Sequence, residues 1–375
     1  MNFLKSERTT LEQFLPSFDA KLASIPLSEI EKPGNPGLAL LRELEGTALL
    51  IPSEYGGRGA SALDAIKIHR AVASRAPSLA IAMTMHNFSV ATLVEYLFYG
   101  NYTVELLQQI SGGRLLVASG FAEGRTGTSI LDPMLKAIPA DDGGYKLNGT
   151  KKPCSLSHSM NILTASVSVP GVNGHGKRRA VAIVPADAEG LSRKPFWKSG
   201  VLGGAESDEL CLTDVHVSAE QIFFPEVEES LDTVEAGGFL WFELLVSASY
   251  LGIVSALVER VLDGGRGDAH ERTQLAIDVE GAMAALEGIA RAMQAGERGE
   301  AILVQSLFVR YAVQQAIERA SARAAELLGG MAFVGSPDVA YLLSACRALA
   351  FHPPSRISVA NSLDGFLMGQ PMQVA

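Results

Sequence analysis

The sequence has few cysteines and no extended basic run, and both absences exclude classes of protein. The three cysteines, Cys154, Cys211 and Cys346, are far apart and form no CxxC pair, so the sequence predicts neither a disulfide framework nor a metal site. Lys and Arg number 31 against 41 Asp and Glu. The chain therefore lacks the positive charge that binds nucleic acid or an anionic membrane surface, and we expect neither partner.

Long uninterrupted apolar stretches are also missing. The longest apolar segment, Leu79 to Phe98, is interrupted by His86, Asn87 and Glu95, each of which is costly at the centre of a bilayer. The first residues carry charges too early for the apolar core of a signal peptide. We therefore expect no membrane span, no export and a cytoplasmic location.

What the sequence does contain is a change of periodicity along the chain. Up to about residue 112, and again from residue 225, apolar residues recur with the 3.6-residue period of helices. Ser61 and Asp64 resemble a capping box at a helix start. The sequence predicts an α+β fold with a helical domain over residues 1–112, an antiparallel β domain over 113–224 and a C-terminal helical bundle over 225–375. The predicted strands cover residues 114–121, 145–147, 161–169, 179–184 and 209–217.

Five short motifs follow one another along the chain in an order that resembles the acyl-CoA dehydrogenase superfamily. They lie at residues 51–59 (IPSEYGGRG), 121–129 (FAEGRTGTS), 148–151 (NGTK), 212–217 (LTDVHV) and 327–333 (LLGGMAF). Each motif is weak alone, but the order and the α–β–α layout match this family over nearly the whole chain. The resemblance implies a flavoenzyme with a four-helix C-terminal bundle, assembled as two or four copies, with FAD between the β domain and the bundle.

The resemblance also assigns the cofactor site. The residues it implies are Phe121, Ala122, Gly127, Thr128, Ser155, Gly329 and Gly330, with Thr128 also contacting substrate. A Gly-rich segment presents successive backbone N–H groups to the anionic edge of a ligand, and side-chain hydroxyls add hydrogen-bonding groups. The family segment that holds the FAD diphosphate has no good match here, so FMN or a diffusing reduced flavin stays open beside FAD.

The catalytic Glu that most of the family carries near its C-terminus has no counterpart, because no Asp or Glu occurs between Asp338 and Asp364. Some members place this Glu on an early helix of the bundle, and Glu243 aligns within one residue of that place. Burial would raise the pKa of such a carboxylate toward the range that a base needs. The alternative is a structural Glu243, at the surface or paired with Arg260 or Arg310.

His352 is the second catalytic candidate. It precedes two prolines and resembles a His in the flavin monooxygenase branch of the superfamily. An imidazole titrates near neutrality, so it could deprotonate a substrate; a simple turn histidine is the alternative. Arg356 aligns with the missing Glu and could bind a carboxylate or phosphate of the substrate, with a solvated cation at a helix end as the alternative.

Three functions stay open. The first is α,β-oxidation of an acyl thioester on coenzyme A or a carrier protein, with electrons leaving to an electron-transfer flavoprotein. The second is a monooxygenase or N-hydroxylase that takes reduced flavin from a partner flavin reductase. The third is a non-catalytic protein that keeps the fold to bind an acyl group or a partner. The dehydrogenase-like motifs place the first slightly ahead.

Overall fold

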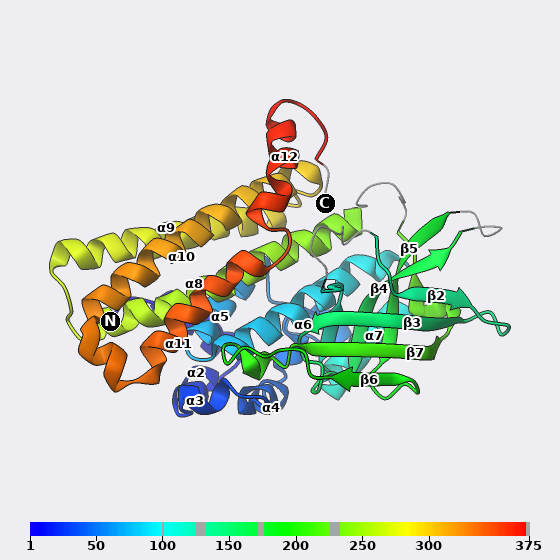
Figure 1. The fold of residues 1–375 in the computed structure, drawn as a ribbon, viewed down its shortest axis with the longest axis horizontal. Helices are drawn as coiled ribbons and strands as arrows, with labels where there is room; N and C mark the ends of the chain where they lie inside the picture. The colour runs from blue at the N-terminus through cyan, green and yellow to red at the C-terminus, as the bar shows by residue number, and fades with distance from the viewer. Residues whose placement is uncertain (100, 125–131, 172–175, 226–232, 373–375) are drawn as a thin grey trace.

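The computed structural model describes residues 1–99, 101–124, 132–171, 176–225 and 233–372. Helices form the two ends of the chain, and a sheet forms the middle. In Figure 1 the sheet lies on the right and the long helices of the C-terminal bundle extend to the left. The N-terminal helices are α1 (Lys5–Phe14), α2 (Phe18–Ala23), α3 (Leu27–Ile30), α4 (Pro36–Glu43), α5 (Ala62–Ala73), α6 (Pro77–Glu95) and α7 (Asn101–Gly113). The C-terminal helices are α8 (Thr233–Asp263), α9 (Ala269–Gln294), α10 (Glu300–Gly335), α11 (Pro337–Ala345) and α12 (Arg356–Leu367), with the 3-10 helix η7 (Cys346–Phe351) between the last two.

Local capping interactions set the starts of several helices. At α5 the Ser61 hydroxyl accepts from the Asp64 N–H at 3.2 Å, and the Asp64 carboxylate accepts from the Ser61 N–H at 3.1 Å. This is the predicted capping box, and the structure confirms it. α4 begins at Pro36, where the Asn35 side chain accepts from the Gly37 N–H at 2.8 Å.

The sheet contains eight strands in the order β6-β7-β3-β2-β4-β5-β8, with β1 paired to β4. The strands are β1 (Val117–Gly120), β2 (Lys136–Pro139), β3 (Tyr145–Cys154), β4 (Ile162–Pro170), β5 (Lys177–Pro185), β6 (Leu191–Lys194), β7 (Asp208–Val217) and β8 (Ile222–Phe223). β2, β6 and β8 were not predicted, because runs of two to four residues are too short to show a period.

The sheet is mixed, so the expectation of a wholly antiparallel domain was wrong in this respect. β1 and β2 both run parallel to β4, whereas β2–β3 and β4–β5 are antiparallel hairpins. Turn residues between two strands fix their direction within a hairpin. Nothing local fixes how one hairpin lies against another, so the parallel pairs could not be read from the turns.

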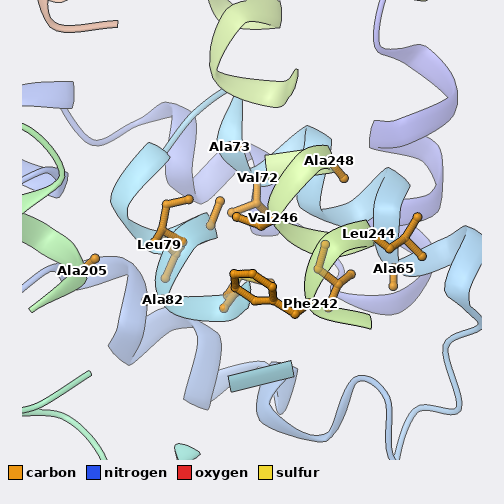
Figure 2. Close-up of a cluster of buried hydrophobic side chains, with 14 of the residues drawn as sticks. Ala65, Val72, Ala73, Leu79, Ala82, Ala205, Phe242, Leu244, Val246 and Ala248 are labelled. Atoms are coloured by element: carbon orange, nitrogen blue, oxygen red, sulfur yellow. The ribbon is translucent and has the colours of Figure 1, made fainter. Parts of the chain in front are cut away.

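Helix α8 forms the centre of the helical core and packs against α5, α6, α9 and α10. Two glycines allow the close approach: a Cβ at Gly252 would lie 2.6 Å from the Ala73 Cβ on α5, and one at Gly238 would lie 2.6 Å from the Thr92 hydroxyl on α6. Within the described residues, α8 over Glu235–Asp263 is the one helix long and apolar enough to cross a membrane, but its most apolar window is 89% buried inside the molecule. Figure 2 shows part of this core, with labelled side chains from α5, α6 and α8: Ala65, Val72, Ala73, Leu79, Ala82, Phe242, Leu244, Val246 and Ala248.

Helix α10 contains a break at the predicted Gly-Gly turn. Gly329 has φ 81° and ψ 167°, which is not helical, and nothing lies within 4 Å of the place its Cβ would occupy. The chain then continues through α11 and η7 to α12, which projects from the bundle (Figure 1). α12 is fastened to the start of α10 by a small apolar cluster of its own, composed of Val304, Leu307, Tyr311, Val359 and Leu363.

Candidate active site

Two of the predicted cofactor segments meet at one edge of the sheet. Phe121 and Ala122 directly follow β1, and the Ala122 carbonyl accepts from the Lys152 N–H of β3 at 2.8 Å. The Cys154 thiol, at the end of β3, donates to the Ser119 carbonyl of β1 at 3.3 Å. Burial raises the pKa of Cys154 to about 12, so it remains a protonated thiol. The end of β1 therefore lies beside the end of β3.

Ser155 adds a pair of hydroxyls to this edge. Its Oγ lies 2.9 Å from the Oγ of Ser207, the residue just before β7. We call Phe121, Ala122, Ser155 and Ser207 the β-domain rim. The hydroxyls can donate or accept hydrogen bonds, so the chemistry of this donor set fits a flavin, whose ring carries both kinds of group. Gly127 and Thr128, the other predicted contacts in this region, lie outside the described residues.

An ion pair connects the Gly-rich segment with β3. The Lys151 ammonium, fully buried on β3, donates to Glu123 at 2.6 Å and to the Ser166 hydroxyl at 2.9 Å. The Glu123 carboxylate also accepts from the N–H groups of Met134 and Leu135. Partial burial opposes ionisation of Glu123, but Lys151 and these N–H groups outweigh it and lower the pKa of Glu123. Glu123 and Lys151 thus fix residues on both sides of 125–131.

Helix α6 connects the β domain with the bundle. The buried His86 imidazole accepts from the Val117 N–H of β1 at 2.9 Å through Nδ1, and its Nε2 lies 2.8 Å from the Thr47 carbonyl. Because a carbonyl only accepts, the proton belongs on Nε2. Two residues along, Phe88 lies edge-on against Phe242 of α8, with ring centroids 5.3 Å apart. α6 therefore contacts the strand that leads to the rim and the helix that carries Glu243.

The second catalytic candidate, His352, packs against Phe242 of this aromatic pair. Its ring centroid is 6.0 Å from that of Phe242, and its Nε2 lies 2.9 Å from the hydroxyl of Tyr250 on α8. Burial of the ring, assisted by the positive charge of Arg310, lowers the pKa of His352 to about 3. The imidazole is therefore neutral near pH 7, which differs from the expectation of a group that titrates near neutrality.

Glu243 is paired with Arg310 of α10, one of the two partners that the sequence suggested. One guanidinium nitrogen, Nη1, donates to both carboxylate oxygens, at 2.8 and 2.7 Å, and both side chains are 1% exposed. Burial raises the pKa of Glu243 while the Arg310 charge opposes that rise. A raised pKa suits a base, but the carboxylate is 1% exposed and paired with Arg310, so a substrate cannot reach its oxygens.

Arg310 also holds the segment that carries His352. Its Nη2 donates to the His352 carbonyl at 2.5 Å, and its Nη1 donates to the Pro353 carbonyl at 3.2 Å. Tyr311 donates to the Pro354 carbonyl at 2.9 Å. One buried cation thus joins α8, α10 and the His-Pro-Pro turn.

The remaining predicted residues, Arg356, Gly329 and Gly330, do not lie with the β-domain rim or with His352. Arg356 is exposed at the start of α12. Gly329 and Gly330 lie near the connection between α8 and α9, since a Cβ at Gly267 would lie 3.0 Å from Leu327. In Figure 1 this end of the bundle is remote from the sheet. No group of three or more His, Cys, Asp or Glu side chains in the described ranges could hold a metal ion.

Sequence reasoning missed Tyr250, Ser207 and the joint role of Glu123 and Lys151. Tyr250 lies seven residues after Glu243, two helical turns along the same face of α8, so the period of that helix was a usable signal. Ser207 gave no signal, because its approach to Ser155 depends on the pairing of β3 with β7.

No protein-family model matches the chain. Isobutylamine N-hydroxylase of Streptomyces viridifaciens is 44% identical over 380 residues, which cover 100% of both chains. The structure of KijD3 in complex with FMN and dTDP-3-amino-2,3,6-trideoxy-4-keto-3-methyl-D-glucose has a TM-score of 0.85 at 20% identity, over 97% of this chain and 94% of that one. Butyryl-CoA dehydrogenase of Megasphaera elsdenii has a TM-score of 0.83 at 18% identity, over 97% and 98% of the two chains.

The two structural matches show the fold that these proteins share. The full-length match at 44% identity shows the family, and the three-part layout agrees with it. The chain belongs to the acyl-CoA dehydrogenase superfamily of flavin-dependent oxidoreductases, alongside isobutylamine N-hydroxylase.

Proposed function

We propose that the protein is an N-hydroxylase of small primary amines that uses reduced flavin and dioxygen. In this reaction the protonated amine, dioxygen and the two-electron reduced flavin give the hydroxylamine, water, oxidised flavin and one proton, which leaves the amine for solvent before the N–O bond forms. One oxygen atom of dioxygen forms the new N–O bond and the other leaves as water. The bound flavin supplies the reducing electrons and the activation of oxygen.

The observation that carries the proposal is the engagement of Glu243. Dehydrogenation of an acyl thioester needs a carboxylate that can remove an α-proton. Glu243 already accepts two hydrogen bonds from Arg310 at 1% exposure, and no Asp or Glu occurs between Asp338 and Asp364. The acyl-thioester function, first in the sequence analysis, therefore becomes the second candidate.

The comparisons support an amine substrate. The relative at 44% identity is named for N-hydroxylation of isobutylamine, and the KijD3 structure contains FMN together with an amino sugar. We infer FMN or FAD as a diffusing reduced cofactor, delivered by a partner reductase that oxidises NAD(P)H. Phe121, Ala122 and Ser155 would hold its ring at the β-domain rim, with Gly127 and Thr128 as further proposed contacts.

His352 is the proposed active-site imidazole. Because its pKa is lowered to about 3, the imidazole is a weak base. It would act as a hydrogen-bonding group toward substrate or flavin and not as a proton acceptor. Tyr250 fixes one of its ring nitrogens, which leaves the other for a ligand. Arg356, being exposed, is retained only as a proposed contact for a substrate that extends toward α12.

We also propose a homodimer or homotetramer. Several large apolar side chains are exposed near the ends of α10 and α12, where a second copy would cover them. They are Met331, Val334, Phe351, Ile357, Leu367 and Met368. Gly329 and Gly330 lie far from the rim of their own chain, so a flavin could reach them only from another copy. Light scattering of the purified protein at several concentrations tests this.

The test of function supplies purified protein with a flavin reductase, NADH, dioxygen and either FMN or FAD. We expect hydroxylamine to form from primary amines of three to five carbons, only when all components are present. A parallel anaerobic mixture of flavin-loaded protein with acyl-CoA and acyl-carrier-protein thioesters should leave the flavin oxidised. Loss of the oxidised flavin absorbance there, with no hydroxylamine in the first assay, would establish the dehydrogenase function instead.

A further inference from the structure

We infer that the carboxylate of Glu206 binds the ammonium group of the substrate. The inference rests on the proposed function, since it names the group that recognises an amine. Glu206 follows the short 3-10 helix η5 (Gly203–Ala205) and precedes Ser207 of the β-domain rim. Nothing in the motifs pointed to this residue.

The backbone of Glu206 is held firmly at the edge of the rim. Leu156 and Glu206 have φ of 62° and 55°, a region that side-chain-bearing residues rarely adopt and that is concentrated at functional sites. Ser157 donates to the Glu206 carbonyl through its N–H at 3.2 Å and its hydroxyl at 2.6 Å. The Leu156 N–H donates to the Ala205 carbonyl at 2.9 Å. These bonds place Glu206 beside the Ser155 turn.

Among the described residues, one oxygen of the Glu206 carboxylate, Oε2, lacks the kind of partner that the neighbouring acidic residues have. The residue is 5% exposed, and its Oε2 is buried without a hydrogen-bond partner in the described ranges. In the same short run of sequence, Asp208 lies 3.0 Å from His158 and Glu209 lies 3.0 Å from Lys152. A desolvated carboxylate oxygen with no donor is costly. A ligand that brings a cationic donor would remove that cost.

A nearby cation, Arg193, already has other hydrogen-bond partners. Arg193 donates from Nε to the Ser157 carbonyl at 2.7 Å and from Nη2 to the Ala186 carbonyl at 3.0 Å. A primary aliphatic amine is protonated at neutral pH, as a lysine is, and carries three N–H donors. One of these N–H donors can bind Glu206, and the hydroxyls of Ser155 and Ser207 can accept hydrogen bonds from the other two. The net charge of −10 favours the approach of a cation.

The test compares butylamine with 1-butanol as probes, each added to flavin-loaded protein. We expect butylamine to raise the melting temperature of the wild-type protein, because a ligand that binds only the native state stabilises it, and 1-butanol to have no comparable effect. In Glu206→Gln the dissociation constant for butylamine should rise about 10- to 100-fold, the contribution of a charge-assisted hydrogen bond. Flavin affinity should stay unchanged.

Glu209→Gln is the matched control, because Glu209 lies three residues away and has its own partner, Lys152. It should bind butylamine as the wild type does. Without ligand, Glu206→Gln should melt no lower than the wild type, since it removes a buried carboxylate oxygen that has no hydrogen-bond partner among the described residues. A clearly lower melting temperature, or weakened flavin binding with amine affinity intact, would overturn the inference and give Glu206 a structural or flavin-binding role.

The outcomes separate this inference from the proposed function. If hydroxylamine forms and the KM for the amine is the same in Glu206→Gln, the function stands and the inference is wrong. If no hydroxylamine forms but butylamine binding depends on Glu206, the inference stands and the function is wrong. A rise in KM with a nearly unchanged kcat supports both, because it identifies a group that binds substrate without taking part in the oxygen transfer.

Discussion

Among single residues, the proposed site depends most on the neutral imidazole of His352. We expect His352→Ala to lower kcat for amine hydroxylation by about 100-fold or more, the usual effect of losing one positioned hydrogen-bonding group. Flavin affinity should be retained, and Tyr250→Phe should have a smaller effect because the ring keeps its place. Since the pKa of His352 is lowered to about 3, it stays uncharged at all higher pH values. His352 should therefore cause no fall in kcat as the pH drops through about 6.5. A fall in kcat near about pH 6.5 that is absent in His352→Ala would show that His352 titrates as a base.

Glu243 gives the complementary residue-scale prediction. Glu243→Gln leaves the Arg310 cation buried without its counter-charge, which should lower the free energy of unfolding by about 3–5 kcal/mol, measured by urea denaturation. The double variant Glu243→Gln/Arg310→Met should recover part of this loss. A Glu243→Gln protein of wild-type stability that can no longer reduce flavin with an acyl thioester would restore Glu243 as the base.

Among the elements, Glu123 and Lys151 hold the described residues at either end of the connection between β1 and β2. Lys151→Met should raise the dissociation constant of flavin by about tenfold, because a buried charge pair contributes on the order of 1.5–3 kcal/mol to the geometry it holds. Fluorescence titration with FMN measures the change. Lys146→Met is the control, since Lys146 is an exposed lysine on the same strand, β3. Equal losses in both variants would refute the role of Lys151.

Elements are also where sequence prediction succeeded and then failed. Helix starts such as Ser61 were predictable, because a capping box needs only residues three apart. The joining of Glu243 to Arg310, 67 residues apart, and of Ser155 to Ser207 depends on tertiary packing. The motifs predicted that the segments at Phe121 and Ser155 lie close together, but the partner of each charge, such as Arg310 for Glu243, required the fold.

For the molecule as a whole, three histidines with lowered pKa values, His69, His86 and His352, make folding sensitive to acid. Burial lowers the pKa of His69 and His352 to about 3 and that of His86 to about 4, whereas an unfolded histidine titrates near 6.5. Below about pH 6.5 the unfolded state binds more protons, so stability falls as the pH drops, by about 1.4 kcal/mol per pH unit for each histidine. Melting temperatures from about pH 7.5 to 5 should decline accordingly. His69→Gln should flatten the decline; the exposed His270→Gln should not.

Phe242 has a consequence of a different kind. Its ring contacts both Phe88 of α6 and the proposed active-site imidazole of His352. A single side chain of α8 therefore packs against α6 and against His352. Shortening that side chain would make space beside His352 without disturbing a charge or a hydrogen bond. Position 242 is accordingly where laboratory evolution of this chain toward bulkier amines should find its first productive substitutions.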